Sequence, residues 1–527
     1  MVQLTNSRLA GVSHRWLALG SLTLALITIG LDQTVLSLAL PTLAGALKAT
    51  ESQLQWFVTA YTLALAAAML PAGLLGDRYG RKTVLVGAIV LFGAMSIACA
   101  FAPDANAFIA ARTVLGIAGA ALMVMSLSVV TVLFSETERP RAMGIWAAGN
   151  FLALPLGPIV GGYLLAHVWW GWVFLMNVPV VLVGLVAVMA FVPQSRSEHR
   201  PSIDILGVLL SSTGLAVLMY GLVQAGEFGW GSSDAIVPSI VAVGILAGFV
   251  LWEAWLTARP NGQPLVELGL FRSRSFSVGL VLAGAGIFGM FGVLFALPQY
   301  MQAVMGLDAQ GAGLRFLPMI VGMVAGAVPA DRVAARIGAK ITVAIGFGIL
   351  AAGMVIGSGM TVSSGDAYIA AFTFVVGVGA GLGMATAVSA AMVEISAERS
   401  GVGGALVQAV VKLGPAFGAS ILGSVLNDTY QSHVSVAGLP ASAATAVHQS
   451  VFKALAVAAQ VGSPALADSA RAAFVVGMDD ATRVAAAIAV AAMLGAVVLL
   501  PRRSAAAKDA TSEIDGPSLK EAAAIGG

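Results

Sequence analysis

Residues 73–82, GLLGDRYGRK, place four ionisable side chains in a short turn between two long apolar runs. The run before the turn covers roughly residues 56–75, and the run after it covers roughly residues 83–101. A helix that spans a bilayer needs about 20 mostly apolar residues. The pattern therefore predicts two membrane-spanning helices joined by a charged turn at one face of the membrane.

A weaker copy of this turn lies in the second half of the chain, at residues 331–340, DRVAARIGAK, again between two apolar runs. It follows the first turn by 254 residues. A second feature recurs at nearly the same interval, because Gly157-Pro158 is followed 257 residues later by Gly414-Pro415. Two features at one spacing indicate a duplicated membrane unit, and transporters are commonly built from such repeats around a central site.

The composition is typical of an integral membrane protein. The chain is 59% hydrophobic and 10% charged, with a mean hydropathy of +0.94, whereas a soluble globular protein carries about 25% charged residues. The net charge of +2 gives no indication of a nucleic-acid partner. Cys99 is the only cysteine and lies in an apolar run, so an intramolecular disulfide is excluded.

Fourteen apolar segments are long enough to span a bilayer, which predicts an all-α integral membrane fold with 14 transmembrane helices. The first segment, residues 16–40, is longer than the roughly 7–15 apolar residues of a signal peptide, so we expect an uncleaved first helix. The segments are centred near Ile27, Leu65, Leu91, Leu122, Ala153, Val181, Leu215, Gly244, Ile287, Val321, Ile349, Val375, Phe417 and Val490.

The distribution of basic residues predicts the orientation. An even number of spans puts both termini on one side of the membrane. Twenty of the 27 lysines and arginines then fall on the side of the termini, and five fall on the other side. Because cytoplasmic segments carry the excess of basic residues, we expect both termini in the cytoplasm.

The repeat interval divides the chain into two pseudo-twofold related halves of six helices with a two-helix insertion, a 6 + 2 + 6 arrangement. The expected segments are a cytoplasmic N-terminus at 1–15, an N-terminal bundle at 16–195, the insertion at 204–257, a C-terminal bundle at 275–500 with a long external loop at about 428–478, and a disordered cytoplasmic tail at 504–527.

Asp32 stands inside the first apolar run, in LDQTVLSLALP, residues 31–41. A carboxylate within the membrane costs several kcal/mol unless it faces water or a partner. Because a low dielectric favours the neutral form of a carboxyl group, such a residue can bind and release a proton during a transport cycle. The alternative is a carboxylate near the outer interface that only fixes helix packing.

Arg112 opens the fourth apolar segment, in ARTVLGIAG, residues 111–119. A buried guanidinium needs an acidic or carbonyl partner, and Asp32 on a neighbouring helix is the best candidate. Protonation of Asp32 would then break the pair. The alternative is an arginine that snorkels to the membrane interface.

The fifth apolar segment contains Gly144, Gly157, Pro158, Gly161 and Gly162. A proline removes one backbone hydrogen bond, and glycines permit bending and close packing, so the segment suits a gating hinge. The alternative is simple small-residue packing between helices. The matching Gly-Pro pair in the second half favours the hinge by symmetry.

The charged turn also contains an acid, Asp77. An excess of basic residues on one side of the membrane explains the lysine and arginines of the turn, but it does not explain this acid. A carboxylate there can pair with a neighbouring base or cap the N-terminus of a helix from the other half, near Gly403. We expect this contact to hold the cytoplasmic side closed and to break as the halves rock. The expected gating residues are Gly73, Asp77, Arg78, Gly80, Arg81 and Lys82.

A sparsely polar cavity is expected for the transported molecule, lined by amide side chains in or at the ends of helices and by large apolar residues near them in the pattern. The candidates are Trp56, Asn150, Phe151, Met290, Gln299, Gln302 and Gln408. The alternative for each apolar residue is contact with lipid or with another helix.

Motifs for enzyme chemistry do not occur in the sequence. It contains no phosphate-binding loop, so we do not expect this chain to use ATP. The five histidines do not cluster at metal-ligand spacing, and nothing resembles a serine-nucleophile elbow. We therefore expect a monomeric membrane protein that is not an enzyme and has no cofactor or metal.

The charged turn at 73–82 resembles motif A of the major facilitator superfamily. Residues 112–119 resemble motif B of that family, and residues 144–162 resemble its antiporter signature, motif C. Three further stretches are similar to motifs of its fourteen-helix drug:proton antiporters, namely residues 31–41, 170–179 and 297–302. The resemblance covers about residues 16–500, and the combination of motifs is highly specific.

The resemblance implies proton-coupled export of drugs, antibiotics or amphipathic natural products across a bacterial cytoplasmic membrane by alternating access. Asp32 would be the coupling carboxylate, Arg112 the proton-relay arginine, and Asp77 with Arg81 the gate. The expected partners are a small amphipathic organic substrate, protons and the lipid bilayer.

The sequence departs from the family pattern at several positions. Ala153 replaces the middle glycine of motif C, Leu115 a frequent glutamine of motif B, and Gly171 a frequent arginine. The thirteenth helix carries Lys412 where some relatives that export divalent cations have a second acid. This departure argues against a dicationic substrate and leaves neutral, monovalent and anionic compounds open.

Two alternative functions remain open from the sequence. The first is a proton-driven exporter of a metabolite, such as an amino acid, a siderophore or a lipid, with the same fold. The second is a membrane sensor that does not transport, for which Asp32 would be dispensable.

Overall fold

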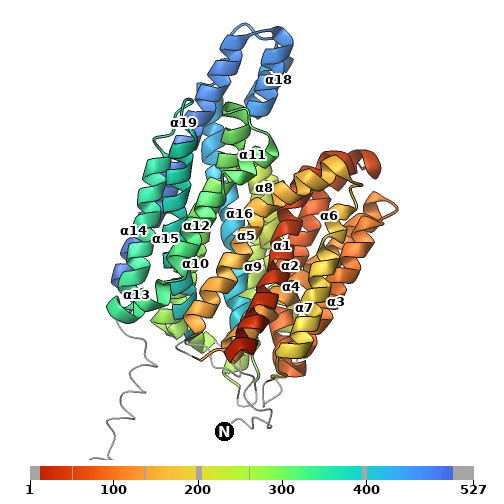
Figure 1. The fold of residues 1–527 in the computed structure, drawn as a ribbon, viewed down its shortest axis with the longest axis vertical. Coiled ribbons are helices and arrows are strands. Elements are labelled where there is room, and N and C mark those ends of the chain that lie inside the picture. The colour runs from red at the N-terminus through yellow and green to blue at the C-terminus, as the bar shows by residue number, and fades with distance from the viewer. Residues whose placement is uncertain are drawn as a thin grey trace, which may run out of the picture.

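The computed structural model describes residues 12–49, 51–135, 138–196, 204–259, 262–266, 268–393 and 400–501. Its long helices lie side by side in two bundles, one formed by the first part of the chain and one by the last (Figure 1). The first bundle contains α1 (Val12–Ala46), α2 (Glu51–Tyr79), α3 (Arg81–Ala100), α4 (Ala105–Leu133), α5 (Arg139–His167), the single turn α6 (Trp172–Leu175) and α7 (Asn177–Phe191).

The second bundle begins after a 3-10 turn, η1 (Leu268–Arg272). It contains α10 (Arg274–Gln299), the π-helical turn η2 (Tyr300–Val304), α11 (Ala309–Leu314), α12 (Leu317–Ala327), α13 (Ala330–Ile337), α14 (Ala339–Gly357), α15 (Asp366–Val393), α16 (Ser400–His433), α17 (Ala441–Gln449), α18 (Val451–Val461) and α19 (Pro464–Leu499). The short α18 and the start of α19 project beyond the rest of the molecule (Figure 1).

Two helices lie between the bundles in sequence, α8 (Ile205–Phe228) and α9 (Ser233–Thr257). They pack on each other, and α8 also packs on α2 of the first bundle and α16 of the second. The insertion is therefore attached to both halves of the molecule through α8.

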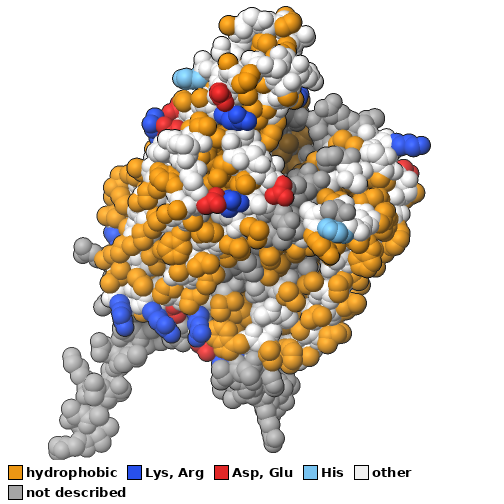
Figure 2. Space-filling view, turned by 45° about the horizontal axis from the view of Figure 1, so that its top comes forward, with side chains coloured by type: hydrophobic (Ala, Val, Ile, Leu, Met, Phe, Trp, Pro, Cys, Tyr) orange, Lys and Arg blue, Asp and Glu red, His pale blue; other side chains and the backbone are white. Residues whose placement is uncertain are grey.

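The fourteen expected spans all fall on helices. Thirteen segments of the described residues are long and apolar enough to cross a membrane. The one remaining expected span is the fifth along the chain, centred near Ala153, and the 29-residue α5 occupies its position. The exposed side chains on the flanks of both bundles are largely apolar, and Lys and Arg side chains gather along one edge (Figure 2). Such a belt of exposed apolar residues fits a surface covered by lipid.

The segment expected as an external loop at about 428–478 is more helical than predicted. The helix α16 continues to His433 and α19 begins at Pro464, so the two long helices enter this segment from both sides. The intervening part forms the short helices α17 and α18. The expected tail at 504–527 and residues 1–11 of the expected N-terminus lie outside the described residues.

The buried apolar residues form two main cores. One core is formed by α1–α7, joined by residues of α8, α9, α10, α15 and α16, and the other is formed by α10–α12 and α14–α19. The first core therefore extends to three helices of the second bundle.

The internal repeat is visible in helix packing. A Cβ added at Gly161 of α5 would lie 2.6 Å from Cγ1 of Val35 in α1, so only glycine permits this approach. In the second half, a Cβ added at Gly418 of α16 would lie 2.6 Å from the carbonyl oxygen of Phe288 in α10. Gly418 follows Gly161 by 257 residues, so the contact of α16 with α10 repeats the contact of α5 with α1.

Candidate functional site

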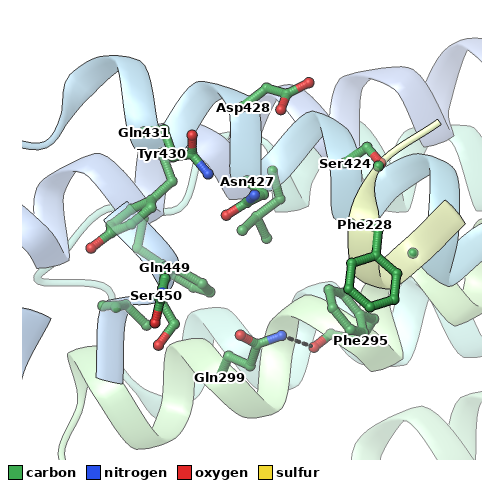
Figure 3. Close-up of a pocket in the computed structure, with 16 residues that line it drawn as sticks. Phe228, Phe295, Gln299, Ser424, Asn427, Asp428, Tyr430, Gln431, Gln449 and Ser450 are labelled. Carbon is green, nitrogen blue, oxygen red and sulfur yellow. Dashed lines mark hydrogen bonds between the residues drawn. The ribbon is translucent and has the colours of Figure 1, made fainter. Parts of the chain in front are cut away.

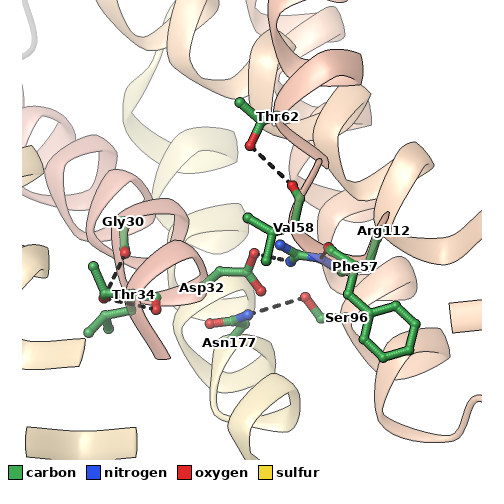
Figure 4. Close-up of polar contacts among 10 residues, drawn as sticks. Gly30, Asp32, Thr34, Phe57, Val58, Thr62, Ser96, Arg112 and Asn177 are labelled. Carbon is green, nitrogen blue, oxygen red and sulfur yellow. Dashed lines mark hydrogen bonds and ion pairs between the residues drawn. The ribbon is translucent and has the colours of Figure 1, made fainter. Parts of the chain in front are cut away.

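An ion pair between Asp32 of α1 and Arg112 of α4 lies inside the first bundle (Figure 4). Arg112 Nη1 donates to Asp32 Oδ2, and both side chains are almost completely buried, with exposed fractions of 0–1%. The pair expected from the sequence is therefore present, and Arg112 does not reach the surface of the bundle. Breaking such a buried pair from one side leaves an uncompensated charge, which costs about 3–5 kcal/mol.

The helix α2 orients the guanidinium of Arg112. Arg112 Nε donates to the carbonyl oxygen of Phe57 at 3.1 Å, and the guanidinium carbon lies 4.3 Å from the centre of the Tyr61 ring. Gly116, one turn along α4, allows this approach, because a Cβ there would collide with the carbonyl oxygen of Tyr61. The glycine of the motif around Arg112 thus lets α4 lie close enough to α2 for these contacts.

The other oxygen of Asp32 is available for a proton. Asp32 Oδ1 is buried and has no hydrogen-bond partner among the described residues. Nearby, Asn177 Nδ2 of α7 donates to Ser96 Oγ of α3 at 3.4 Å, and Asn177 Oδ1 also lacks a partner in the described part of the chain (Figure 4). Buried polar atoms are nearly always satisfied by protein or water, so Oδ1 offers the place where a proton or a water molecule can bind.

The charged turn links the two halves. Asp77 Oδ1 accepts hydrogen bonds from Arg81 Nη2 at 2.8 Å and Nε at 3.2 Å. Asp77 Oδ2 accepts a hydrogen bond at 3.0 Å from the backbone N–H of Val402, in the first turn of α16. A carboxylate at this position stabilises the exposed N–H groups and the positive end of the helix dipole. The expected contact near Gly403 is thus made one residue earlier.

The backbone of the turn requires Gly80, whose φ of 108° lies in the region that side chains disfavour. Gly338, at the same place between α13 and α14 in the repeated turn, has a φ of 89°. Lys82 Nζ donates to the carbonyl oxygen of Met189 at 2.8 Å, and Arg78 lies over the Tyr79 ring at 5.7 Å. Gly73 is buried on α2, one turn before Asp77.

The glycines of the fifth helix make contacts in two directions. A Cβ at Gly144 would lie 3.1 Å from the carbonyl oxygen of Ala327, at the end of α12 in the other half. Gly157 and Gly161 face Thr34 and Val35 of α1, and Gly162 faces open space. The helix continues without a break through Pro158, whose side chain lies outside the described part. The described glycine contacts at Gly157 and Gly161 are therefore packing contacts with the helix that carries Asp32.

The expected cavity residues lie in different environments. Met290 is fully buried in the core of the second bundle, and Trp56 is 42% exposed on α2. Gln408 is buried on α16, and its Nε2 has no partner among the described residues. Gln299 lines a cavity at the end of α10. Gln302 is half-buried in η2, and the side chains of Asn150 and Phe151 lie outside the described residues.

A buried polar cluster of the inserted helices was not singled out from the sequence. Asp204 accepts hydrogen bonds from the indole of Trp252 at 2.9 Å and from the backbone N–H of Gly207 at 3.0 Å. Glu253 is fully buried and accepts from the backbone N–H of Val266 at 3.1 Å. The signal was Glu253, an acid far from the start of the apolar run at 233–257. The cluster joins both ends of the insertion to the segment that leads into α10.

A metal site is not formed by the described residues, since no three His, Cys, Asp or Glu side chains among them lie together in a suitable group. The site thus consists of a buried ion pair, a hydrogen bond between halves and a set of close helix contacts. This arrangement can bind a proton and transmit its effect to helix packing.

The sequence matches the family described as the Major Facilitator Superfamily over residues 22–419. The chain belongs to the major facilitator superfamily. Two curated relatives of this chain are named for efflux or export. It is 33% identical to "Multidrug efflux pump LfrA" of Mycolicibacterium smegmatis, over 91% of this chain and 95% of that protein. It is 31% identical to "Tetracenomycin C resistance and export protein" of Streptomyces glaucescens, over 98% of each chain.

Solved structures agree on the fold. The human organic anion transporter MFSD10 has a TM-score of 0.59 at 14% identity, with 92% of this chain and 98% of that chain covered. The proton:xylose symporter XylE has a TM-score of 0.57 at 15% identity, with 92% and 95% covered. This major facilitator protein is accordingly an all-helical, multi-pass membrane transporter, as the motif resemblance implied.

Proposed function

We propose that this protein exports drugs, antibiotics or amphipathic natural products in exchange for protons by alternating access. The observation that carries the proposal is the buried Asp32–Arg112 pair, in which one carboxylate oxygen has no partner in the described part of the chain. The relatives named for multidrug efflux and for tetracenomycin C export support the choice of substrate class.

Proton binding acts on Asp32. A proton that binds Oδ1 neutralises the carboxylate while Oδ2 still faces Arg112. The ionic part of the attraction between the two side chains is then lost and their hydrogen bond weakens, while Arg112 keeps its bond to the Phe57 carbonyl and its contact with the Tyr61 ring. Protonation therefore weakens one of the contacts that hold α1 on α4.

The effect of protonation can reach the second bundle through α1, which carries Asp32, and through α2, which contacts Arg112. α1 contacts α5 through Thr34 and Val35, and α5 packs on α11 and α12. Arg112 contacts α2, and α2 packs on α16. A change in the Asp32–Arg112 pair thus reaches α2 and α5, two of the helices through which the first bundle contacts the second. The bond from Val402 to Asp77 breaks when the halves separate at the α2–α3 end.

The orientation and state of assembly follow the sequence-based expectations. We place the α2–α3 end and both termini in the cytoplasm, because the basic residues concentrate there, and we take the transporter to act as a monomer in the bacterial cytoplasmic membrane. A proton that moves inward down about 100 mV gains about 2.3 kcal/mol, enough for roughly 50-fold accumulation of a neutral substrate outside.

Lys412 argues against a dicationic substrate and leaves neutral, monovalent and anionic substrates open. Lys412 lies on α16, one turn after Gln408, and has no hydrogen-bond or ion-pair partner among the described residues. An unpaired cation within a spanning helix repels further positive charge. No acid is present on α16 between Ser400 and Asn427 to offset it.

The function is tested by ethidium efflux from cells that lack their own pumps, with and without this chain and with an uncoupler. Efflux that depends on the chain and stops with the uncoupler supports the proposal. Efflux that persists with the uncoupler contradicts proton coupling. An absence of efflux for every dye in a panel would instead favour a dedicated metabolite exporter.

A further inference from the structure

A cavity of about 510 Å³ lies at the end of the molecule opposite the α2–α3 turn. The ends of α8 and α10, the last turns of α16, the junction of α17 and α18, and one residue of α19 enclose it (Figure 3). This volume falls within the roughly 300–1,000 Å³ of typical small-molecule sites. The cavity belongs to the second bundle and the insertion, so it is separate from the Asp32–Arg112 pair.

One wall of the cavity is aromatic. Phe228 from the end of α8 and Phe295 from α10 lie next to each other on one side (Figure 3). Their exposed fractions are 55% and 41%, so their ring faces remain available. Aromatic rings of a ligand stack on such faces, and a cationic ring system gains further attraction.

The remaining walls carry amide groups, two of which have no hydrogen-bond partner among the described residues. Asn427 and Gln431 of α16 make no hydrogen bond with the described residues. Gln299 Nε2 donates to the Phe295 carbonyl at 3.0 Å, which leaves Oε1 as an acceptor. Gln449 Oε1 accepts from Lys453, which leaves Nε2 as a donor. The cavity thus offers donors and acceptors on several sides of one space.

The charge of the lining selects among ligands. Asp428 at the rim is the one ionisable acid of the lining, and the lining contains no Lys or Arg. The nearest cation along the chain, Lys453, is bonded to Gln449. An anionic ligand would meet a carboxylate and no compensating charge, whereas a neutral or cationic ligand meets no such barrier.

We infer that this cavity is an outer binding site for an uncharged or cationic aromatic molecule that carries several hydrogen-bonding groups. Phe228 and Phe295 hold the rings, and Asn427, Gln431 and Gln299 hold the polar groups. The cavity lies beside α16 and α8, and both helices pack on α2. We therefore take the cavity to be the site that a substrate occupies as it leaves. This last role rests on the proposed function, whereas occupation of the cavity does not.

The single cysteine of the chain allows a direct test. In a Cys99→Ala background, Ser424→Cys places a thiol in the cavity, and Ser432→Cys places a matched thiol two turns later on α16, outside this cavity. Both serines donate to backbone carbonyls of α16, and Ser432 Oγ also lies 3.1 Å from His433 Nδ1. The rate of maleimide labelling of the purified full chain is measured with ethidium, and separately with the anionic dye fluorescein.

Ethidium at about ten times its Kd should leave the site about one-tenth free and slow labelling of Ser424→Cys about tenfold. Labelling of Ser432→Cys should not change, fluorescein should protect much less, and Phe295→Ala should remove the protection. Phe374→Ala, which truncates a phenylalanine of similar exposure on α15, serves as the control and should retain it. The same protection is expected with Asp32→Asn, which lacks the proposed coupling carboxylate.

Equal protection at both thiols, no protection by ethidium, or equal protection by fluorescein would overturn the inference. The two proposals fail separately. Proton-coupled ethidium efflux without protection of Ser424→Cys removes the outer site and leaves the proposed function. Protection without efflux removes the proposed function and leaves the binding site.

Discussion

Arg112 and Asp32 are each other's charged partner inside the first bundle, with Nη1 of Arg112 donating to Oδ2 of Asp32 and neither side chain exposed to more than 1%. The arginine is fixed from α2 by the Phe57 carbonyl, while Oδ1 of the aspartate lacks a partner among the described residues. Binding of one proton to Asp32 would therefore change the net charge of this buried pair.

Removing one partner should destabilise the protein more than removing both. Arg112→Met leaves a buried carboxylate without its cation, which we expect to lower the free energy of unfolding by about 3–5 kcal/mol. The double variant Asp32→Asn with Arg112→Met should recover most of this loss. Thermal unfolding of the purified variants measures the coupling. Additive losses in the double variant would contradict a direct pair.

The contact between Asp77 and Val402 should control access from the α2–α3 end. Asp77→Ala removes the bond between halves, and a lost helix cap costs about 0.5–2 kcal/mol, so we expect the open state to become several-fold more populated. The rate of maleimide labelling of Leu127→Cys, in the Cys99→Ala background, measures the population of the open state. Leu127 is suitable because it is buried where α4 meets Gly404 of α16.

Labelling of Leu127→Cys should therefore accelerate with Asp77→Ala. Glu138→Ala is the control, since Glu138 is an acid bonded to Arg15 at 2.8 Å within the first bundle. Similar acceleration by both changes would show that Asp77 acts through general loosening and not through the contact between halves.

Neighbouring glycines of α5 should respond differently to alanine. A methyl group at Gly161 would collide with Val35, and overpacking of this kind costs about 1–3 kcal/mol, so Gly161→Ala should lower the thermal midpoint. A Cβ at Gly162 meets no atom within 4 Å, so Gly162→Ala should leave the midpoint unchanged or raise it slightly. If both variants lost transport without loss of stability, a hinge would explain the motif better than packing.

The charge of Lys412 should influence substrate choice. Lys412→Met removes a cation that has no partner among the described residues. We expect the ratio of ethidium efflux to fluorescein efflux to rise, by about tenfold if the ammonium lies within a few ångströms of the substrate. Lys340→Met, at the start of α14 and outside both proposed binding regions, is the control. An unchanged ratio would place Lys412 outside the substrate path.

The main features of the fold and the charged contacts were predictable because they follow from strong local rules. The lengths of the apolar segments located the fourteen helices. Because a buried charge needs a partner, the sequence predicted the pairing of Asp32 with Arg112 and the contact of Asp77 with the start of α16. The cost of isolated charge in a membrane makes such inferences specific. The end of α16 was misplaced, because polar residues beyond the apolar stretch do not by themselves end a helix.

The cavity-lining residues were less predictable. Met290 and Trp56 lie in apolar helices whose outer faces are also apolar, so hydrophobicity does not separate residues that face a cavity, a core or lipid. The outer cavity brings Phe228, Phe295 and Asn427 together from three distant segments, and its existence depends on how these segments pack. The sequence shows Glu253 as an acid inside an apolar run, but only the structure shows that Asp204 lies beside it.

The most direct test of the account is uphill ethidium transport in proteoliposomes that hold purified protein, with an imposed proton gradient. We predict that Asp32→Asn abolishes accumulation while it retains exchange of ethidium without a gradient. Asp104→Asn, a capping residue at the start of α4 that remains able to cap, should behave as the wild type. Accumulation by Asp32→Asn at the wild-type level would contradict the claim that Asp32 couples transport to protons.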